Sequence, residues 1–362
     1  MDILIITIPG DVHAHAAIWA LGRLGRVCRR WFPSDLAGDP ALLRLSDPGF
    51  GVHLSGPDGP IDGRSVDTVW LRRFRVPEIP ESLPEGDRVI AKRESESFLR
   101  GLNFALGNEG DVFWANTPAA QRVASLKTPQ LVAAQQVGLK VPRTLMTNDM
   151  DEVRAFFRAA HGRIIYKGFL PAVWEADSSQ YVLQTVLVDE HMLEDTDSLR
   201  LSPGIFQEFI PKKYELRVTV FGQTIVAAQI TDQDEVDWRT THKMKLTPYT
   251  LPAAVADKVL ALMKRLGLAM GTIDMIVNAE GEYVFLEVNE QGQFLWVEEM
   301  NPEIRVLDPF ARFLAAGRAD FQWQPQEELR FGDYLASPAF TAFRAQEQLK
   351  RSSAGNVIVK DS

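Results

Sequence analysis

The sequence predicts an α/β protein that begins with a parallel-sheet unit and continues into strand-rich α+β units. Residues 2–8 (DILIITI) form a continuous apolar run, as strands buried on both faces of a parallel sheet do. Residues 14–24 then have helical spacing, so strand and helix alternate from the start. From Gly138 onward the pattern becomes rich in short β-type runs. Together these observations indicate an α/β class with more than one domain.

The N-terminal unit continues the alternation of strand and helix. Short strands are predicted at 51–54 and 67–72, and a helix at about 87–106. The unit is expected to end near the loop at 114–118. The chain then divides into an N-terminal α/β domain, a central domain, a C-terminal domain and an extension with a disordered end, over residues 1–117, 118–203, 204–330 and 331–362.

Two helices are predicted on either side of Lys127. One helix cannot run from Pro118 to Gly138, because Pro129 would remove a hydrogen bond and clash with the preceding turn. The second helix is expected to have Thr128 as its N-cap and Pro129 at its first position. Lys127 then lies beside the positive end of a helix, which is unfavourable unless both share an anion. The alternative is an ordinary exposed lysine at a helix break.

A second lysine, Lys167, ends a predicted strand over 163–167. The loop that follows, residues 168–180, is long enough to act as a lid. Farther along lies an acidic stretch at 189–197.

The C-terminal unit is predicted to contain two antiparallel hairpins. The first turns at Phe221–Thr224, and the second runs from 270 to 289 through a turn at 279–281. Helices are expected over 253–266 and near 305–316.

The second hairpin carries a candidate cation site. Glu287 and Asn289 are two residues apart on a strand and therefore project from one face. Val284, Leu286 and Val288 are expected to fill the other face as core. Two oxygen ligands at the end of a rigid strand suit a hard divalent cation. A half-buried strand that shows polar groups to water is the alternative.

Asp274 on the partner strand extends this patch. If the hairpin closes through a tight turn, Asp274 faces Phe285 and lies diagonal to Glu287. Three oxygen side chains with no basic residue between them would repel one another unless a cation intervened. Mg²⁺ fits, because it binds one or two carboxylates and completes its shell with phosphate oxygens and water.

Cationic side chains in the same unit indicate anion binding. Glu215 and Arg217 share a strand face, and the planar fork of Arg217 suits phosphate or acyl-phosphate oxygens. The alternative is a surface ion pair of little energetic value. Arg239, His242 and Lys243 form a cationic run, for which a solvated loop is the alternative.

The pentapeptide at 206–210 (FQEFI) is a candidate nucleotide contact. An extended segment between two lobes can hydrogen-bond an adenine through its backbone, as at Phe209. Gln207 and Glu208 add side-chain groups, and a carboxylate can take the ribose hydroxyls. An ordinary strand of mixed polarity is the alternative.

Bulk properties limit the function classes. The chain has 362 residues, 46% apolar and 24% charged, as soluble globular proteins do. A net charge of −9 makes a sequence-independent nucleic-acid binder an unfavourable reading, because phosphate contacts need a basic surface. Cys28 is the only cysteine, so no intrachain disulfide can form. With no secretory signal and no apolar run of about 20 residues, a cytoplasmic protein without a membrane partner is expected.

The order of these features resembles the ATP-grasp superfamily, matched from Lys127 to Asn289. Within it, the chain is similar to the peptide-maturing ligases that make graspetides, the microviridin-type macrocycles. The segments that carry this narrower resemblance are HAHAAIWAL (13–21), VWLRR (69–73), GLKVPRTLMTND (138–149), FQEFIPKKYELRVTVFG (206–222), DWRTTHK (237–243), GTIDMIV (271–277) and LEVNEQGQFLWVE (286–298).

The resemblance implies an ATP-grasp fold with an N-terminal pre-ATP-grasp domain, a lid-like central domain and a C-terminal catalytic domain. It implies ATP and Mg²⁺ as cofactors. The residues assigned to ATP are Lys127, Lys167, Gln207, Glu208, Phe209 and Glu215, and those assigned to Mg²⁺ are Asp274, Glu287 and Asn289. Arg217 is assigned to the transferring phosphoryl group, and Arg239 to the acyl phosphate or the acceptor. The loop after Lys167 holds one glycine, Gly168, where a glycine-rich phosphate cover is common in the superfamily.

The resemblance also implies an activity. A side-chain carboxylate of a ribosomal precursor peptide, with leader and core, would attack the γ-phosphate of ATP, and a hydroxyl or amine of the same peptide would then close an ester or amide ring. His242 is a candidate general base for a hydroxyl. The central domain is expected to bind the leader, with residues 189–197 as a candidate contact and a solvated loop as the alternative, and a homodimer is implied. The alternatives are a ligase for a small amino acid or a protein tail, and a nucleotide-dependent peptide binder without catalysis.

Overall fold

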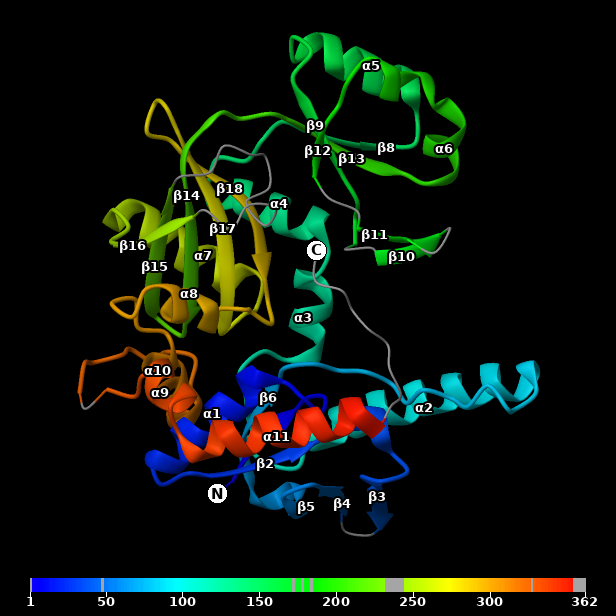
Figure 1. Cartoon of the computed structure of the whole chain (residues 1–362), viewed down its shortest axis with the longest axis vertical. Helices are drawn as coiled ribbons and strands as arrows, with labels where there is room; N and C mark the ends of the chain where they lie inside the picture. The colour runs from blue at the N-terminus through cyan, green and yellow to red at the C-terminus, as the bar shows by residue number, and fades with distance from the viewer. Residues whose placement is uncertain are drawn as a thin grey trace.

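The structure is a computed structural model. It describes residues 2–46, 49–170, 173–176, 179–182, 185–231, 244–326 and 328–353. Figure 1 shows a parallel sheet near the N-terminus, a small antiparallel sheet at the opposite end, and a five-stranded sheet beside both. The expected α/β class, with several sheets, is confirmed. Within the described ranges no helix is both long and apolar enough to cross a membrane.

A four-stranded parallel sheet in the order β2-β1-β6-β7 opens the chain. Its strands are β1 (Asp2–Ile6), β2 (Val27–Trp31), β6 (Val66–Leu71) and β7 (Phe113–Trp114). One face packs on α2 (Glu85–Leu106) and the other on α1 (Val12–Arg23) and α9 (Leu307–Ala316). Because both faces are covered there, β1 is apolar and buried from its second residue onward, as the run at 2–8 indicated.

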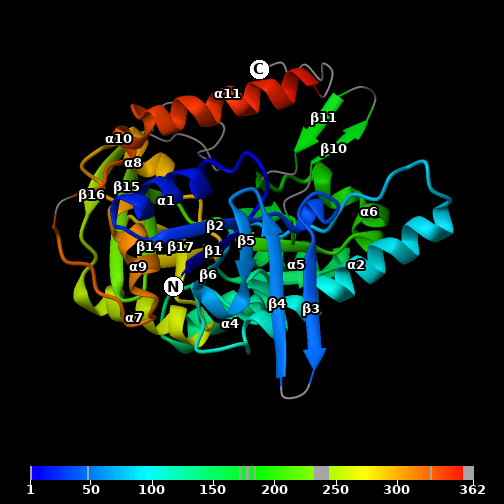
Figure 2. The ribbon, with the colours of Figure 1, turned by 90° about the horizontal axis from the view of Figure 1, so that it is seen from below.

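Additional elements surround this sheet. They are β3 (Ala41–Ser46), β4 (Gly49–Gly56), β5 (Gly59–Asp62), α10 (Phe331–Leu335), α11 (Pro338–Ser353) and the short 3₁₀ turns at Pro33–Asp35 and Gly63–Ser65. Figure 2 shows α11 lying along α1, where the rings of His15 and Phe343 are 4.1 Å apart. The C-terminal segment therefore packs on the N-terminal sheet unit, and residues 354–362 lie outside the described part of the chain.

The central unit is built on a four-stranded sheet in the order β12-β9-β13-β8. Its elements are β8 (Thr144–Thr147), α5 (Met150–Ala159), β9 (Ile164–Lys167), β10 (Val173–Ala176), β11 (Ser179–Val182), β12 (Val186–Leu187), the 3₁₀ turn His191–Glu194, α6 (Thr196–Leu201) and β13 (Gly204–Glu208). The expected loop at 168–180 is wrong in part, because β10 and β11 pair there as a hairpin. Strand β13 pairs with β8 and β9, so this strand belongs to the central sheet although it follows the expected boundary at 203.

The five-stranded antiparallel sheet has the order β16-β15-β14-β17-β18. Its strands are β14 (Lys212–Phe221), β15 (Thr224–Thr231), β16 (Lys245–Tyr249), β17 (Met270–Asn278) and β18 (Tyr283–Asn289), so both predicted hairpins are confirmed. Its apolar face packs on α4 (Lys127–Gln136) and α7 (Ala253–Arg265). The other face carries the polar side chains of Arg217, Asp274 and Glu287, while Ala228, Ile230 and Leu246 pack into the apolar cluster shared with the N-terminal unit. Helix α8 (Leu295–Met300) lies beside this sheet (Figure 1).

The predicted helix break around Lys127 is confirmed, but the predicted N-cap of the second helix, Thr128, is wrong. Helix α3 (Pro118–Ala124) ends before Lys127, and α4 begins at Lys127 itself. Thr128 therefore lies inside the first turn, where its hydroxyl is 3.2 Å from the Met146 sulfur, and does not cap the helix. Pro129 is tolerated there because the first-turn N–H groups have no partner within the helix.

Candidate active site

The polar face of the five-stranded sheet gathers the predicted cation ligands. Arg217 on β14 lies opposite Asp274 on β17, and Asp274 lies opposite Glu287 on β18. The expected pairing of Asp274 with Phe285 is wrong for two reasons. Met275, not Asp274, lies opposite Phe285, and a register shift between Asp274 and Met275 moves the pairing on by one more residue, so that Asp274 faces Glu287. This β-bulge places the two carboxylates side by side.

The bulge also changes which residues form the core face of β18. Phe285 and Val288 belong to the apolar cluster beneath the sheet. Leu286 was expected there and is only half-buried, because it is the extra residue of the bulge. The predicted common face for Glu287 and Asn289 is correct, since the bulge lies before both.

Two basic side chains form ion pairs with the carboxylates of Asp274 and Glu287. Arg217 Nη1 donates to both Asp274 oxygens at 2.7 and 2.8 Å, and Lys127 Nζ forms an ion pair with Glu287. Asn289 Nδ2 lies 3.3 Å from Asp274 Oδ2 and 3.4 Å from Glu287 Oε1. The expectation that no basic residue separates these oxygens is therefore wrong, and repulsion alone does not call for a metal ion.

The donor set nevertheless fits Mg²⁺. Two carboxylates and one amide lie within a single hydrogen-bonded cluster, and hard cations take such oxygen ligands. No three His, Cys, Asp or Glu side chains converge within the described ranges, so the amide oxygen of Asn289 would supply the third ligand. Arg217 and Lys127 would remain beside the ion as partners for phosphate oxygens.

Lys167 lies close to this cluster from the central sheet. The pKa of Lys167 is lowered to about 8, chiefly by burial; Glu287 opposes this shift and the positive charge of Lys127 adds to it. The structure thus brings the two predicted phosphate lysines to the same carboxylate, from the start of α4 and the end of β9. A desolvated pair of lysines is stabilised by a bound polyanion.

Gln207 and Glu208 lie at the end of β13. Gln207 is fully buried, its Nε2 donates to Thr144 Oγ1 at 2.9 Å, and its Oε1 accepts no hydrogen bond. Glu208 accepts from Arg143 Nε at 2.8 Å, which lowers the pKa of Glu208. Gln207 therefore keeps an unused acceptor, whereas Glu208 is already paired.

Phe209 and Glu215 are also engaged. The Phe209 N–H donates to the Arg163 carbonyl at 3.0 Å, and the Arg163 guanidinium stands 4.7 Å from the Phe209 ring centre. The backbone N–H of Phe209 is thus not free for an adenine. Glu215 is buried and accepts from Lys212 Nζ at 2.6 Å.

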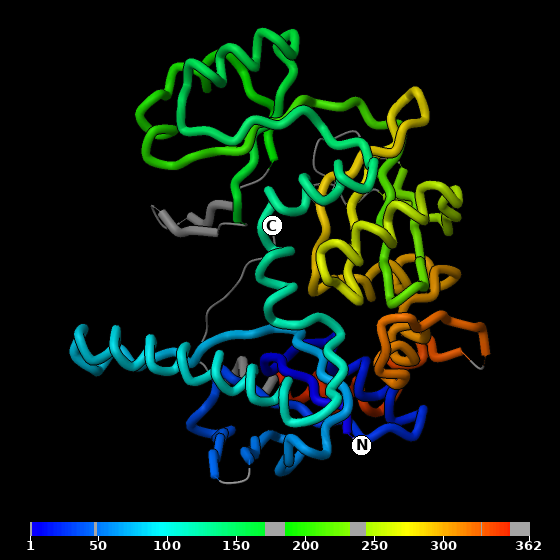
Figure 3. Tube along the Cα trace, turned by 180° about the vertical axis from the view of Figure 1, so that it is seen from behind, coloured from blue at the N-terminus to red at the C-terminus, as the bar shows by residue number. Residues whose placement is uncertain are grey.

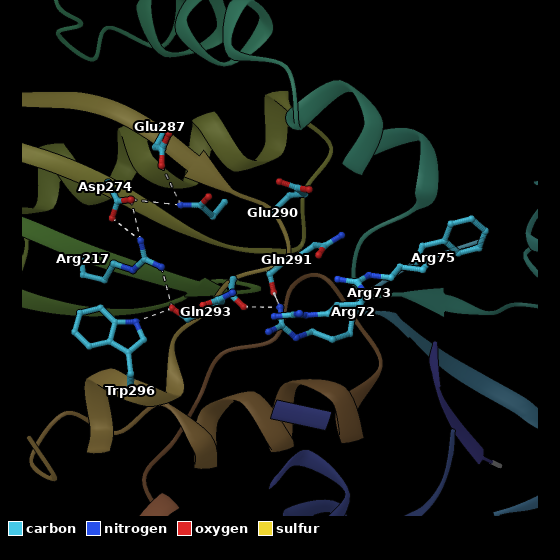
Figure 4. A pocket seen from close by; sticks show the side chains of 13 residues that line it. Arg72, Arg73, Arg75, Arg217, Asp274, Glu287, Glu290, Gln291, Gln293 and Trp296 are labelled. Carbon is cyan, nitrogen blue, oxygen red and sulfur yellow. Dashed lines mark hydrogen bonds and ion pairs between the residues drawn. The ribbon is translucent and has the colours of Figure 1, made fainter. Parts of the chain in front are cut away.

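A cavity of about 720 Å³ opens between the polar sheet face and the N-terminal unit. Figure 4 shows its two sides, with Asp274, Glu287 and Arg217 on one and the arginines after β6 on the other. We call these the sheet wall (Arg217, Asp274, Glu287, Asn289) and the arginine wall (Arg72, Arg73, Arg75). The residues assigned to the lysine and adenine contacts do not line this cavity.

The arginine wall lies at the carboxyl ends of β1 and β6, the usual ligand-binding edge of a parallel sheet. Arg72 is 1% exposed, with its Nε 3.3 Å from Asp11 Oδ2, and its Nη2 has no hydrogen-bond partner. Arg73 Nε is 3.6 Å from the same Asp11 oxygen. Burial by itself would raise the pKa of Asp11, but Arg72, His13 and Arg73 hold it below its usual value. Asp11 therefore stays ionised and anchors the wall.

The loop that links the two walls is held by buried polar side chains. Arg72 Nη1 donates to the Gln291 and Gly292 carbonyls at 2.9 and 2.8 Å, and Arg217 Nη2 to the Gln293 carbonyl at 2.8 Å. Each of these two arginines therefore lines the cavity and also binds the backbone of the loop.

Three further side chains hold the loop and its approach. Gln130 bonds both backbone groups of Val288 at 2.9 Å, and Asn116 Nδ2 donates to the Glu290 carbonyl at 2.7 Å. His13 Nε2 accepts from the N–H groups of residues 294 and 295 at 3.3 and 3.4 Å. Burial, and then Arg72, lower the pKa of His13 to about 3, so its ring is neutral and can accept. The positions of the loop and of its approach are therefore fixed by five side chains from separate parts of the chain.

No protein-family model and no curated protein sequence matches the chain. Several solved structures do match the chain. The macrocyclase MdnC of Microcystis aeruginosa MRC, bound with its precursor peptide MdnA, is 28% identical with a TM-score of 0.78, covering 87% of this chain and 100% of that one. A ligase from Chryseobacterium gregarium, an ATP-grasp enzyme associated with ribosomally synthesised and modified peptides and solved with ADP and a leader and core peptide, is 27% identical with a TM-score of 0.79, covering 91% and 99%. The macrocyclase MdnB of Microcystis aeruginosa MRC is 28% identical with a TM-score of 0.73, covering 87% and 97%.

The chain is an ATP-grasp ligase. The resemblance to graspetide-type maturases is confirmed over nearly the whole chain. Two predicted residues of this ATP-grasp ligase, Arg239 and His242, lie outside the described residues.

The sequence analysis missed the residues that build the arginine wall and hold the loop, namely Asp11, His13, Arg72, Arg73, Asn116 and Gln130. His13, Arg72 and Arg73 stand in the motifs HAHAAIWAL and VWLRR, which carried the resemblance. A usable signal was present, since polar residues directly follow apolar strands whose carboxyl ends meet at one edge.

Proposed function

We propose that this ATP-grasp ligase activates Asp or Glu side chains of a ribosomal precursor peptide as acyl phosphates and joins them to Ser, Thr or Lys side chains. The products would be ester or amide macrocycles. The observation that carries the proposal is the cavity in which a balanced sheet wall faces an arginine wall. The full-length likeness to a ligase solved with ADP and a leader and core peptide supports it.

The sheet wall is proposed to hold the phosphates of ATP. Asp274, Glu287 and Asn289 would bind Mg²⁺, which when bound neutralises charge on the phosphate oxygens. Lys127 and Arg217, which pair with these carboxylates in the structure, would pair with phosphate oxygens instead. Arg217 then lies beside the group in transfer and stabilises the charge that develops there.

The adenosine is proposed to contact the end of β13 and the start of β14. The unused Oε1 of Gln207 is a suitable acceptor for the adenine amino group. Glu208 and Glu215 would take the ribose hydroxyls, and Phe209 would contribute its carbonyl, since its N–H is already used. Lys167 would reach the phosphates from β9.

The arginine wall is proposed to hold the peptide carboxylate. The free Nη2 of buried Arg72, with Arg73 and Arg75 beside it, presents donors to an acid. A carboxylate oxygen attacks the γ-phosphorus, the bond to the β–γ bridging oxygen breaks, and ADP leaves with that electron pair. The acyl phosphate stays within reach of Arg217 and Arg72, so its charge is not exposed to water.

Ring closure is the second step. A hydroxyl or amine of the same peptide attacks the acyl carbon, phosphate leaves, and the nucleophile gives up one proton. We assign Arg239 to the acyl phosphate or acceptor, and His242 to the proton of a hydroxyl. The leader would bind the central unit, with residues 189–197 as candidates, and the enzyme would act as a cytoplasmic homodimer.

The test uses ATP, Mg²⁺ and synthetic copies of whichever short peptides, containing Ser or Thr and Asp or Glu, the neighbouring genes encode. Mass spectrometry should show the loss of one water per bond, together with one ADP per bond. A peptide that forms ADP and incorporates an added amino acid, without losing water, would replace macrocyclisation with intermolecular ligation. Absence of ADP with each of these peptides counts against the proposal.

A further inference from the structure

A second hollow continues from the proposed active site. It measures about 760 Å³ and is lined by residues of α3 and of the C-terminal half of α2. Figures 1 and 3 show these two helices from opposite sides. Phe74, Glu290 and Gln291 line both this hollow and the active-site cavity. The two spaces are therefore neighbours on either side of Phe74, and a chain held at the arginine wall can extend past Phe74 into the second one.

The second hollow differs from the first in chemistry. Leu71, Phe74, Val76, Phe104 and Trp114 contribute apolar side chains to its lining. Phe104 is 73% exposed although it lines a concave surface, and Val76 and Phe74 are half-buried. Aromatic surface exposed in a concavity is typical of a binding groove.

A buried amide marks the same groove. Asn103 is 7% exposed and lines the hollow next to Phe104 on α2, yet its buried Oδ1 accepts no hydrogen bond in the described structure. Buried polar groups are rarely left without a partner, so the amide indicates a ligand with complementary groups. A peptide backbone supplies both an N–H and a C=O, which an Asn side chain can bind together.

We propose that the groove between α2 and α3 binds the extended stretch of the peptide substrate that adjoins the reacting acid. A bulky apolar side chain of that stretch lies against Phe104 and Phe74, and Asn103 bonds its backbone. This rests on the proposed function, which places the acid at the arginine wall, and adds a specificity rule. An aromatic or branched aliphatic residue stands at a fixed offset from each acid that reacts.

The experiment selects peptides on the immobilised enzyme. The probe is a displayed pool of dodecapeptides with one Glu at a fixed central position and random residues elsewhere, offered with Mg²⁺ and a non-hydrolysable ATP analogue. The proteins compared are the wild type, Phe104→Glu, Asn103→Leu and Leu45→Glu. Leu45 is 76% exposed on β3, away from the groove, and serves as the matched control.

The wild type and Leu45→Glu should enrich aromatic or branched aliphatic residues at one offset from the Glu, and Phe104→Glu should lose that preference. Asn103→Leu should bind the enriched peptides about tenfold more weakly, as expected for a lost hydrogen-bond pair. No positional preference in the wild type, or one that persists in Phe104→Glu, overturns the groove assignment.

Two other outcomes distinguish an error in the proposed function from an error in the groove assignment. Enriched peptides whose Glu gives no ADP with ATP would count against the proposed function, while the groove assignment would stand. Light scattering that shows a dimer lost in Phe104→Glu, with its peptide preference unchanged, would assign the groove to a second copy of the chain and overturn the inference.

Discussion

The two walls of the cavity balance their charges differently. On the sheet wall, Asp274 is paired with Arg217 and Glu287 with Lys127. On the arginine wall, Arg72 and Arg73 share one buried carboxylate, Asp11, and Arg75 lines the same side of the cavity. In a chain with a net charge of −9, this surplus of positive charge is local and directed into a cavity. From this difference we infer that Arg217 and Lys127 would leave their carboxylates for phosphate when a metal–nucleotide binds. The arginine wall, in contrast, has positive charge left over to bind an added anion.

The walls also differ in how the chain builds them. The sheet wall comes from three neighbouring antiparallel strands, with its carboxylates set side by side by one bulge. The three side chains of the arginine wall follow β6, whereas Asp11, which anchors them, follows the parallel strand β1 about 60 residues earlier. Long-range assembly of this kind requires many fixed contacts, and the bonds from Arg72 and His13 to the linking loop provide them.

The largest effect is expected on the sheet wall. Glu287→Gln keeps the shape of the side chain but removes the charge proposed to hold Mg²⁺, so ADP formation should fall roughly a hundred- to a thousandfold. The measurement is ADP release with saturating ATP and the peptide that loses water in the test above. Glu280→Gln, in the exposed turn of the same hairpin, is the control and should keep its activity. Normal turnover in Glu287→Gln would remove this residue from the metal site.

The arginine wall should respond differently. Arg73→Gln removes one donor to the peptide acid, and a lost charge-assisted hydrogen bond is expected to raise the KM for the peptide about tenfold or more. The KM for ATP should stay unchanged, since the phosphates are assigned to the other wall. Arg93→Gln, exposed on α2, is the matched control. A rise in the KM for ATP in place of the peptide KM would reverse the assignment of the two walls.

The sequence predicted the sheet wall better than the arginine wall for a physical reason. Asp274, Glu287 and Asn289 lie on one predicted hairpin, so alternation along each strand was enough to place them on one face. The bulge at Leu286 was not predictable, because nothing in the alternation marks the extra residue. The roles of Asp11, Arg72 and His13 depend on which strands are neighbours in the parallel sheet, and strand order is not encoded in local spacing.

The linking loop offers a test of how the walls are held together. Gln130→Met fills the same space but leaves both backbone groups of Val288 without partners in a buried position. Two unsatisfied groups should cost about 2–4 kcal/mol of unfolding free energy, measured by urea denaturation. Gln135→Met, exposed on the same helix, should change stability little. An unchanged midpoint in Gln130→Met would show that the loop does not depend on this contact.

The smallest effect concerns Lys167, above the sheet wall. Because burial lowers its pKa to about 8, its side chain is charged below that pH and neutral above it. The kcat/KM for ATP, which reports the free enzyme, should therefore fall by up to about tenfold per unit as the pH rises through about 8. Lys167→Arg should abolish this alkaline limb, because a guanidinium stays protonated, and the exposed Lys264→Arg should retain it. If the limb persists in Lys167→Arg, another group titrates there, and the contact between the central sheet and the phosphates must be reassigned.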